Sequence, residues 1–198
     1  MLLRTSPTSP FVRKVRLAAD WLNIPLELKP ADTADSSDSL RLENPLGKVP
    51  VLITDDGETC FDSRVILAHL DQVAGGGRIL PADPKARLAA MRLEALADGL
   101  MDAGILVLYE TRFRPEDRHE PRWLDHQKGK MDRAVDALEH NPPRADDMTV
   151  GTIAVACALG FLDFRFGGRW RESHPRLAAF QDAFAARCPA FADTAPRA

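Results

Sequence analysis

Ser9, near the start of the chain, lies at the N-terminus of a predicted helix, a position that favours contact with an anion. Apolar residues recur at helical spacing just after it, at Phe11, Val15, Ala18 and Leu22. The pattern predicts a helix over residues 10–22, with Pro10 at its first position and Ser9 as the N-cap. Unpaired N–H groups and the positive end of the helix dipole favour an anion there. From these residues alone, Ser9 is either an ordinary cap or a group aimed at a bound anion.

The composition argues against several classes of protein. With 198 residues, 45% of them hydrophobic, the chain suits one large globular domain or two modest ones. The formal net charge is −3 and the basic residues are scattered, unlike those of a nucleic-acid binder. No apolar window is long enough for a membrane span, and Arg4 interrupts the apolar run at the N-terminus. We therefore expect a cytoplasmic protein that binds neither membrane nor nucleic acid.

The cysteines and histidines predict no metal site and no redox pair. Cys60, Cys157 and Cys188 are odd in number, far apart, and form no CxxC pair, so we expect three free thiols in a reducing compartment. Cys60 and Cys157 lie in apolar segments and are expected to be small core residues. None of the five histidines has a partner four residues away, and none is predicted to bind metal.

The first part of the chain alternates strand and helix signals. We expect strands at residues 1–3, 24–29, 51–53 and 58–61, a helix at 10–22, and a second helix just after Asp62 and Ser63, either of which could be its N-cap. The small, acidic segment 31–40 predicts a surface loop or irregular helix, and Asp56-Gly57 predicts a hairpin turn. Glycines and prolines over residues 75–84 predict a linker. This order describes a compact α/β sandwich.

The second part of the chain predicts helices alone. Helical spacing covers residues 85–114, 121–140, 149–166 and 175–187. The third of these segments is apolar almost all round and should form the buried centre of a bundle.

Three motifs resemble the cytosolic glutathione transferases, in the same order and spacing: TSPFVRKVR (8–16), NPLGKVPVL (44–52) and FDS (61–63). EALADGLMDAG (94–104) and TIAVACALGFLDFR (152–165) are similar to the bacterial YibF-like members. The resemblance implies the glutathione transferase fold, with a thioredoxin-like glutathione-binding domain over residues 1–78 and an all-helical domain over 85–198. It also implies a homodimer. Many members start the buried helix with Ser or Thr and an acid three residues later. Here Thr152 follows Thr149, so we expect the reciprocal capping bond to be weak or absent.

The resemblance also implies how glutathione is held. The bond before Pro50 would be cis, so that the backbone of Val49 pairs with the cysteinyl part of glutathione. Asp62 and Ser63, at a helix start, would hold the ammonium and carboxylate of the γ-glutamyl end. Lys48 either reaches the glycyl carboxylate or remains solvated.

In this setting Ser9 would donate a hydrogen bond to the glutathione sulfur and stabilise its thiolate. Such a bond contributes about 1.5 to 3 kcal/mol, or roughly one to two pKa units. Ser6 and Thr8 are alternatives for this role, farther from the helix start. Family members with Cys at this place exchange disulfides, so Ser9 favours conjugation or peroxide reduction.

One face of the long helix could bind the electrophile beside Phe11. Its residues are Asp98, Asp102, Ile105, Tyr109 and Arg112 or Phe113. The alternative is that these residues make dimer contacts or are solvated. The leading hypothesis is a glutathione S-transferase that acts in detoxification. The alternatives are a glutathione-dependent peroxide or disulfide reductase and a binding module without catalysis.

Overall fold

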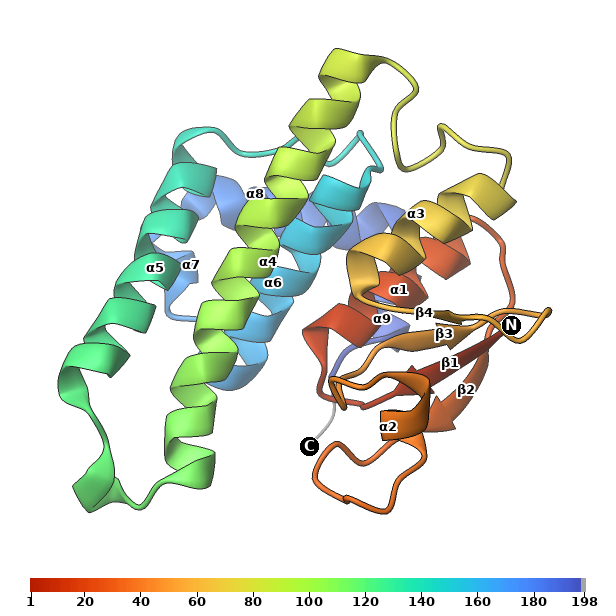
Figure 1. Ribbon diagram of the computed structural model, residues 1–198. Coiled ribbons are helices and arrows are strands. Elements are labelled where there is room, and N and C mark those ends of the chain that lie inside the picture. The colour runs from red at the N-terminus through yellow and green to blue at the C-terminus, as the bar shows by residue number, and fades with distance from the viewer. Residues whose placement is uncertain (197–198) are drawn as a thin grey trace.

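The computed structural model describes residues 1–196, and its first part is a small sheet with helices on both sides (Figure 1). The elements are β1 (Leu2–Thr5), α1 (Pro10–Trp21), β2 (Glu27–Pro30), α2 (Leu40–Glu43), β3 (Val51–Ile53), β4 (Thr59–Cys60) and α3 (Ser63–Val73). The strand order is β2-β1-β3-β4, with β1 parallel to β2 and antiparallel to β3, and β3 antiparallel to β4. In Figure 1, α1 and α3 lie above the sheet and α2 lies below it.

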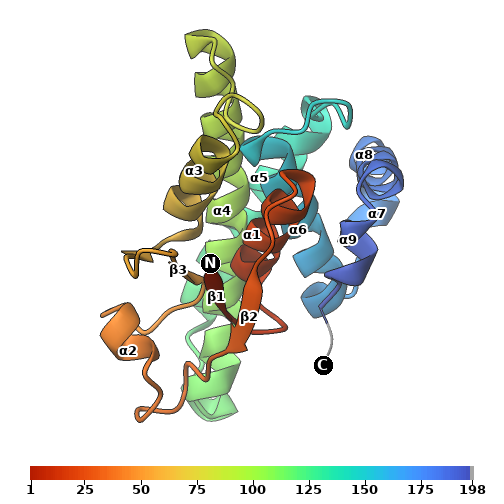
Figure 2. The same cartoon turned by 90° about the vertical axis from the view of Figure 1, so that its right-hand side faces the viewer.

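From residue 84 onward the described chain is helical. Its elements are α4 (Pro84–Phe113), the 3-10 helix η1 (Glu116–Arg118), α5 (Pro121–His140), α6 (Val150–Phe166), α7 (Trp170–Ser173), α8 (Pro175–Arg187) and α9 (Ala190–Asp193). The mixed α/β part and the helical part together confirm the predicted fold class. Figure 2 shows α1 next to α6, with α9 close by. Among the helices of residues 1–196, none combines the length and apolar character that crossing a membrane requires.

Helix α6 forms the centre of the helical part, as predicted. Every residue from Val150 to Leu162 is buried, because a helix that is apolar on all sides needs cover on all sides. Thr149 caps the helix by accepting a hydrogen bond from the Thr152 N–H at 3.2 Å. The expectation of a weak reciprocal bond was wrong: the Thr152 hydroxyl accepts from the Thr149 N–H at 2.8 Å. A threonine oxygen can thus take the place of the usual acid.

Long-range pairing corrects the expected start of β2, whereas the acidic segment forms a surface loop, one of its two expected forms. β2 begins at Glu27 rather than Ile24, because Glu27 pairs with Leu2 of β1. The segment 31–40 lies in turns, and its end is held by buried Arg4, which contacts Asp38 and Glu43 at 2.5 Å each. This ion-pair cluster fixes the short helix α2 beneath the sheet.

A buried aspartate organises the linker between the two parts. The Asp71 carboxylate accepts hydrogen bonds from the N–H groups of Gly77, Arg78 and Ile79 at 2.9, 2.9 and 2.7 Å. Residues 75–77 all have positive φ, which glycine adopts without the cost that other residues incur. These bonds and glycine conformations fix the path of the linker from the end of α3 to the start of α4.

Candidate functional site

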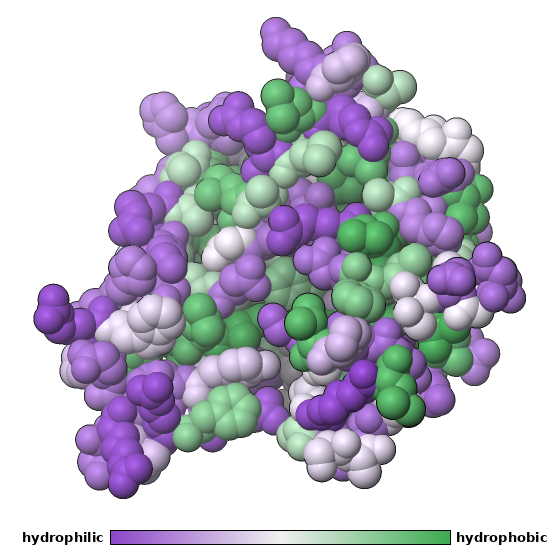
Figure 3. All heavy atoms as spheres, viewed as in Figure 1, coloured by the Kyte–Doolittle hydropathy of each residue, from purple (hydrophilic) through white to green (hydrophobic). Residues whose placement is uncertain are grey.

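A hollow lies between α4 and the sheet. Figure 3, viewed as Figure 1, shows hydrophobic residues gathered in it. Charges from both parts of the chain meet in this region: loss of water around Asp102 on α4 raises its pKa although its surface remains exposed, the Asp98 charge adds to the rise, and Lys48 from the first part opposes it. A ligand in the hollow would contact both parts.

Ser9 caps α1 as the sequence predicts. Its Oγ accepts a hydrogen bond from the Val12 N–H at 3.3 Å, and Pro10 occupies the first helical position. The Ser9 N–H donates to the Ser6 carbonyl at 3.2 Å, which closes the turn before the helix. Within residues 1–196 the Ser9 hydroxyl hydrogen has no acceptor, so it is available to a ligand.

The loop before β3 presents an unpaired stretch of backbone. The Val49-Pro50 peptide bond is cis, as the resemblance implied. In the described part of the chain, neither the N–H nor the C=O of Val49 has a hydrogen-bond partner. The loop is shaped by buried Asn44, which donates to the Lys48 carbonyl at 2.9 Å and accepts from the Leu46 N–H at 3.0 Å. The sequence places Asn44 in a turn rich in proline and glycine, but sequence reasoning gave its side chain no role.

Asp62 and Ser63 stand at the start of α3. Asp62 is the N-cap, its carboxylate accepts from the Arg64 N–H at 3.0 Å, and 60% of its side chain is exposed. The Phe61-Asp62 bond is also cis, which nothing in the sequence indicated. Ser63 is 2% exposed, and its N–H has no partner among residues 1–196.

Behind Ser63 lies a buried cluster of charges. Lys14 of α1 is fully buried, and its Nζ lies 3.2 Å from Ser63 Oγ, 2.9 Å from Glu94 Oε1 and 2.7 Å from Asp98 Oδ1. Burial raises the pKa of both carboxyls, and the Lys14 ammonium opposes the rise. Asp98 was expected to share the cleft face with Asp102, but it is 2% exposed and turns inward to Lys14. The sequence reasoning gave Lys14 and Glu94 no role.

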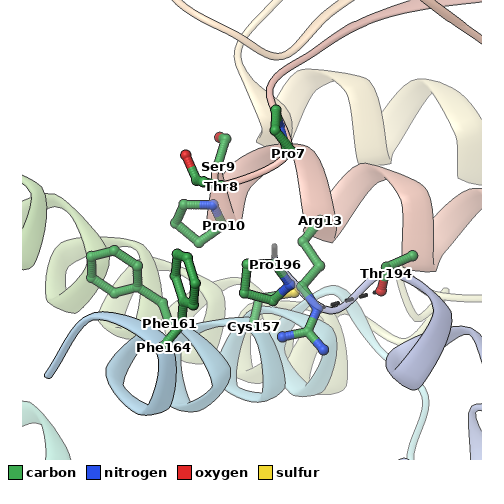
Figure 4. Close-up of a pocket in the computed structure, with 10 residues that line it drawn as sticks. All are labelled: Pro7, Thr8, Ser9, Pro10, Arg13, Cys157, Phe161, Phe164, Thr194 and Pro196. Carbon is green, nitrogen blue, oxygen red and sulfur yellow. Dashed lines mark hydrogen bonds between the residues drawn. The ribbon is translucent and has the colours of Figure 1, made fainter. Parts of the chain in front are cut away.

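A small pocket lies directly at Ser9 (Figure 4). Its other described lining residues are Pro7, Thr8, Pro10, Arg13, Cys157, Phe161, Phe164, Thr194 and Pro196. In Figure 4 the two phenylalanines of α6 lie below the ring of Pro10, and the Arg13 side chain runs from α1 toward Thr194. The sequence reasoning did not identify this aromatic wall, which lies on the other side of Pro10 from the hydroxyls of Thr8 and Ser9 (Figure 4).

Arg13 joins α1 to the last helix. Its guanidinium lies 3.9 Å from the centre of the Phe191 ring and donates to the Phe191 carbonyl at 2.6 Å. Gly160 permits this packing, since a Cβ there would lie 2.3 Å from an Arg13 nitrogen. The contact holds the C-terminal helix against the pocket.

The residues expected to bind the electrophile lie along the exposed side of α4. Asp102, Tyr109, Arg112 and Phe113 are all exposed, and none belongs to the lining of the pocket at Ser9. Tyr109 and Phe113 pack edge to face at 5.2 Å between ring centres, and the Arg112 guanidinium lies 5.3 Å from the Phe113 ring centre. Phe11 is half-buried, with its ring centre 6.0 Å from Lys14 Nζ. That Phe11, Asp102, Tyr109, Arg112 and Phe113 bind the electrophile therefore stays a proposal.

The cysteines of the structure are buried or partly buried thiols. Cys157 and Cys188 are buried and Cys60 is intermediate, and all three are free. Burial raises the pKa of Cys157 to about 12, so almost none of it is thiolate at neutral pH. In the described residues, no cluster of His, Cys, Asp and Glu side chains could hold a metal ion.

Alkylation should distinguish these thiols. We expect iodoacetamide at neutral pH to modify Cys60 slowly and to leave Cys157 and Cys188 untouched, because burial hides both and keeps them protonated. Mass spectrometry locates the adducts, with the unfolded protein as the control for full reaction. Rapid modification of Cys157 in the folded protein would contradict its burial.

The chain is similar to one family of proteins over its whole length. Residues 3–78 match the family model described as "Glutathione S-transferase, N-terminal domain". The chain is 36% identical to the uncharacterized GST-like protein YibF of Escherichia coli K12, over 99% of this chain and 98% of that protein. A glutathione transferase family member from Pseudomonas fluorescens Pf-5 with bound glutathione has a TM-score of 0.93 at 40% identity, covering 100% of this chain and 99% of that one. A structure of such a member from the same strain, with bound S-(propanoic acid)-glutathione, has a TM-score of 0.87 at 38% identity and full coverage of both chains.

Proposed function

The chain belongs to the glutathione S-transferase family, and we propose that it ionises the thiol of glutathione for attack on a small electrophile. The observation that carries the proposal is the Ser9 hydroxyl: it stands at the start of α1, beside an aromatic pocket, with its hydrogen free to donate. Free glutathione should titrate near the reference thiol pKa of about 8.5, which leaves only a few per cent as thiolate at pH 7. A donor that meets the sulfur anion lowers this pKa.

The rest of glutathione fits the remaining groups of the site. The free N–H and C=O of Val49, before cis Pro50, can pair with the cysteinyl backbone as an added strand. The N–H and hydroxyl of Ser63 at the start of α3 suit the γ-glutamyl carboxylate, and exposed Asp62 suits the ammonium. Lys48 is exposed on the loop between these points and suits the glycyl carboxylate.

Conjugation is the reaction that we favour. The Pseudomonas fluorescens relative binds S-(propanoic acid)-glutathione, in which the sulfur carries a carbon substituent. A serine at position 9 offers no thiol for a mixed disulfide, and the raised pKa of Cys157 keeps that nearby thiol from replacing it. The electrophile would lie beside Ser9 and Phe11, against the exposed side of α4, because the pocket at Phe161 and Phe164 is too small to hold it.

We also propose that the protein acts in detoxification as a cytoplasmic homodimer. Large apolar side chains are exposed on α3 and the first half of α4: Val65 (52%), Leu88 (60%) and Met91 (49%). A second copy of the chain would remove them from water.

Calorimetry and ultraviolet absorbance test the function together. We expect saturable glutathione binding, thiolate absorbance of the bound tripeptide above that of free glutathione at neutral pH, and conjugation of a generic aryl halide. Binding without extra thiolate would favour a binding module instead. Faster turnover of peroxides or disulfides than of electrophiles would favour a reductase, and failure to bind glutathione would refute the proposal.

A further inference from the structure

Lys14 has no hydrogen-bonding capacity left for water or ligand. An ammonium has three N–H donors, and each meets one acceptor: Ser63, Glu94 or Asp98. Two of these acceptors are carboxylates of α4, whereas Ser63 opens α3. One buried nitrogen thus joins three helices behind the predicted glutathione site.

The four innermost charges of the cluster around Lys14 balance one another, and exposed Asp62 adds a negative charge on the outside. Lys14 and Arg64 carry the positive charges, and Glu94 and Asp98 carry the negative ones. Arg64 lies on the outer side, with Nε 3.3 Å from Asp98 Oδ2 and Nη2 3.6 Å from Asp62 Oδ2. Buried charges are tolerated when they are paired in this way. Both residues expected to hold the γ-glutamyl end are therefore attached to the cluster, Ser63 through Lys14 and Asp62 through Arg64.

The contact with Lys14 decides which hydrogen bond the Ser63 hydroxyl can make next. A hydroxyl has one hydrogen and two lone pairs, and here the ammonium occupies a lone pair. The positive charge also repels the hydroxyl hydrogen, which must therefore point away from Lys14. Ser63 is left as a donor, and a donor is what a carboxylate requires.

We propose that Lys14 is a positioning residue for the γ-glutamyl carboxylate of glutathione, acting through Ser63. It fixes the hydroxyl as an outward donor and supplies a positive charge behind it. Glu94 and Asp98 hold Lys14 in place from α4, so the helical part of the chain contributes to a contact made in the sheet part. This inference rests on the proposed glutathione binding.

A charge-balanced pair of variants tests Lys14. Lys14→Met with Glu94→Gln removes one charge of each sign, and Glu94→Gln alone keeps the contact between Lys14 and Ser63. Calorimetry is done with glutathione and with an analogue that lacks the γ-glutamyl carboxylate, 4-aminobutyryl-cysteinyl-glycine. Relative to Glu94→Gln, we expect the double variant to bind glutathione about ten-fold more weakly, the loss typical of a hydrogen bond to a charged group. Binding of the analogue should change less than about two-fold, because it lacks the group on which Lys14 acts.

Equal losses for both ligands, or no loss for either, would overturn the role of Lys14. Ser63→Ala gives an independent result in case the double variant does not fold, since it removes a single oxygen. We compare the ratio of the Kd for the analogue to the Kd for glutathione. In Ser63→Ala this ratio should be about ten-fold smaller than in the wild type. Unchanged discrimination would refute the inference even though glutathione still binds. A wild type that binds neither ligand would instead refute the proposed function.

Discussion

Ser9→Ala should lower kcat/KM for conjugation by about 10- to 100-fold at neutral pH, while the Kd for glutathione changes less than about three-fold. The hydroxyl would bond the sulfur most strongly once it is an anion, so its loss affects ionisation and attack more than capture. A hydrogen bond to a charged group contributes about 1.5 to 3 kcal/mol, which corresponds to this range of rates. The measurement is steady-state conjugation with calorimetric Kd values for both proteins.

The pH profile gives Ser9→Ala a second signature. Activity should rise as bound glutathione loses its thiol proton, so the rising limb marks the pKa of that thiol. Without the Ser9 donor this pKa is higher, and the limb should move upward by about one to two pH units. At a pH above both pKa values the two proteins should differ least.

A matched variant separates the hydroxyl from the helix cap. Ser9 also accepts from the Val12 N–H, and its loss to alanine costs about 1 kcal/mol of helix stability. Ser9→Gly lacks the hydroxyl too but lowers capping by only a few tenths of a kcal/mol. If Ser9→Gly keeps wild-type activity, the helix start matters and the hydroxyl does not. If both variants keep it, Thr8 in the same pocket, or Ser6, becomes the candidate donor.

Local signals were sufficient to predict the main helices. The limits of α5 (Pro121–His140) and α8 (Pro175–Arg187) match the expected ones, because a proline marks each first turn and the apolar spacing lies within the segment itself. The helices α2, α7 and α9 were missed as separate elements. Each has four residues, too few to show a period.

The charged cluster could not be predicted from one segment. Lys14 is separated by 80 residues from Glu94 and by 84 from Asp98, and only the tertiary fold brings the Lys14 side chain of α1 to α4. Residues four apart on a helix differ by about 40° in direction, since a turn has 3.6 residues. At the edge of the cleft this angle is enough to turn Asp98 inward and leave Asp102 exposed.

The aromatic wall of the pocket was hidden by the composition of α6. Its segment is apolar on all sides, so Phe161 and Phe164 could not be told apart from core residues by their spacing. Ser9 was recognisable because it directly precedes a proline and a helical apolar pattern, which marks it as an N-cap. The capping residue at the start of α1 could therefore be predicted from its neighbours in sequence. Phe161 and Phe164, which reach the pocket from α6, could not.

Gly151→Ala should reduce the free energy of unfolding by about 1 to 3 kcal/mol, the typical range for overpacking a tight interior. An added Cβ would lie 2.6 Å from the carbonyl oxygen of Ala90 and 2.8 Å from the Leu93 Cβ. The first contact is with the backbone of α4, which cannot rotate aside as a side chain can. Helix α6 cannot shift to relieve the clash either, because it is buried on all sides.

Chemical denaturation measures this effect, with Gly129→Ala as the matched control. Gly129 also lies inside a helix, but its nearest atom is the flexible end of Arg133, at 3.1 Å from the added Cβ. Alanine forms helix better than glycine, so Gly129→Ala should raise the free energy of unfolding by up to about 1 kcal/mol. The two identical substitutions should thus have opposite signs. Because Leu93 precedes Glu94, forcing α4 away at Gly151 should also loosen the bond from Glu94 to Lys14 and weaken glutathione binding. A Gly151→Ala protein as stable as Gly129→Ala would mean that α4 and α6 do not meet at this glycine.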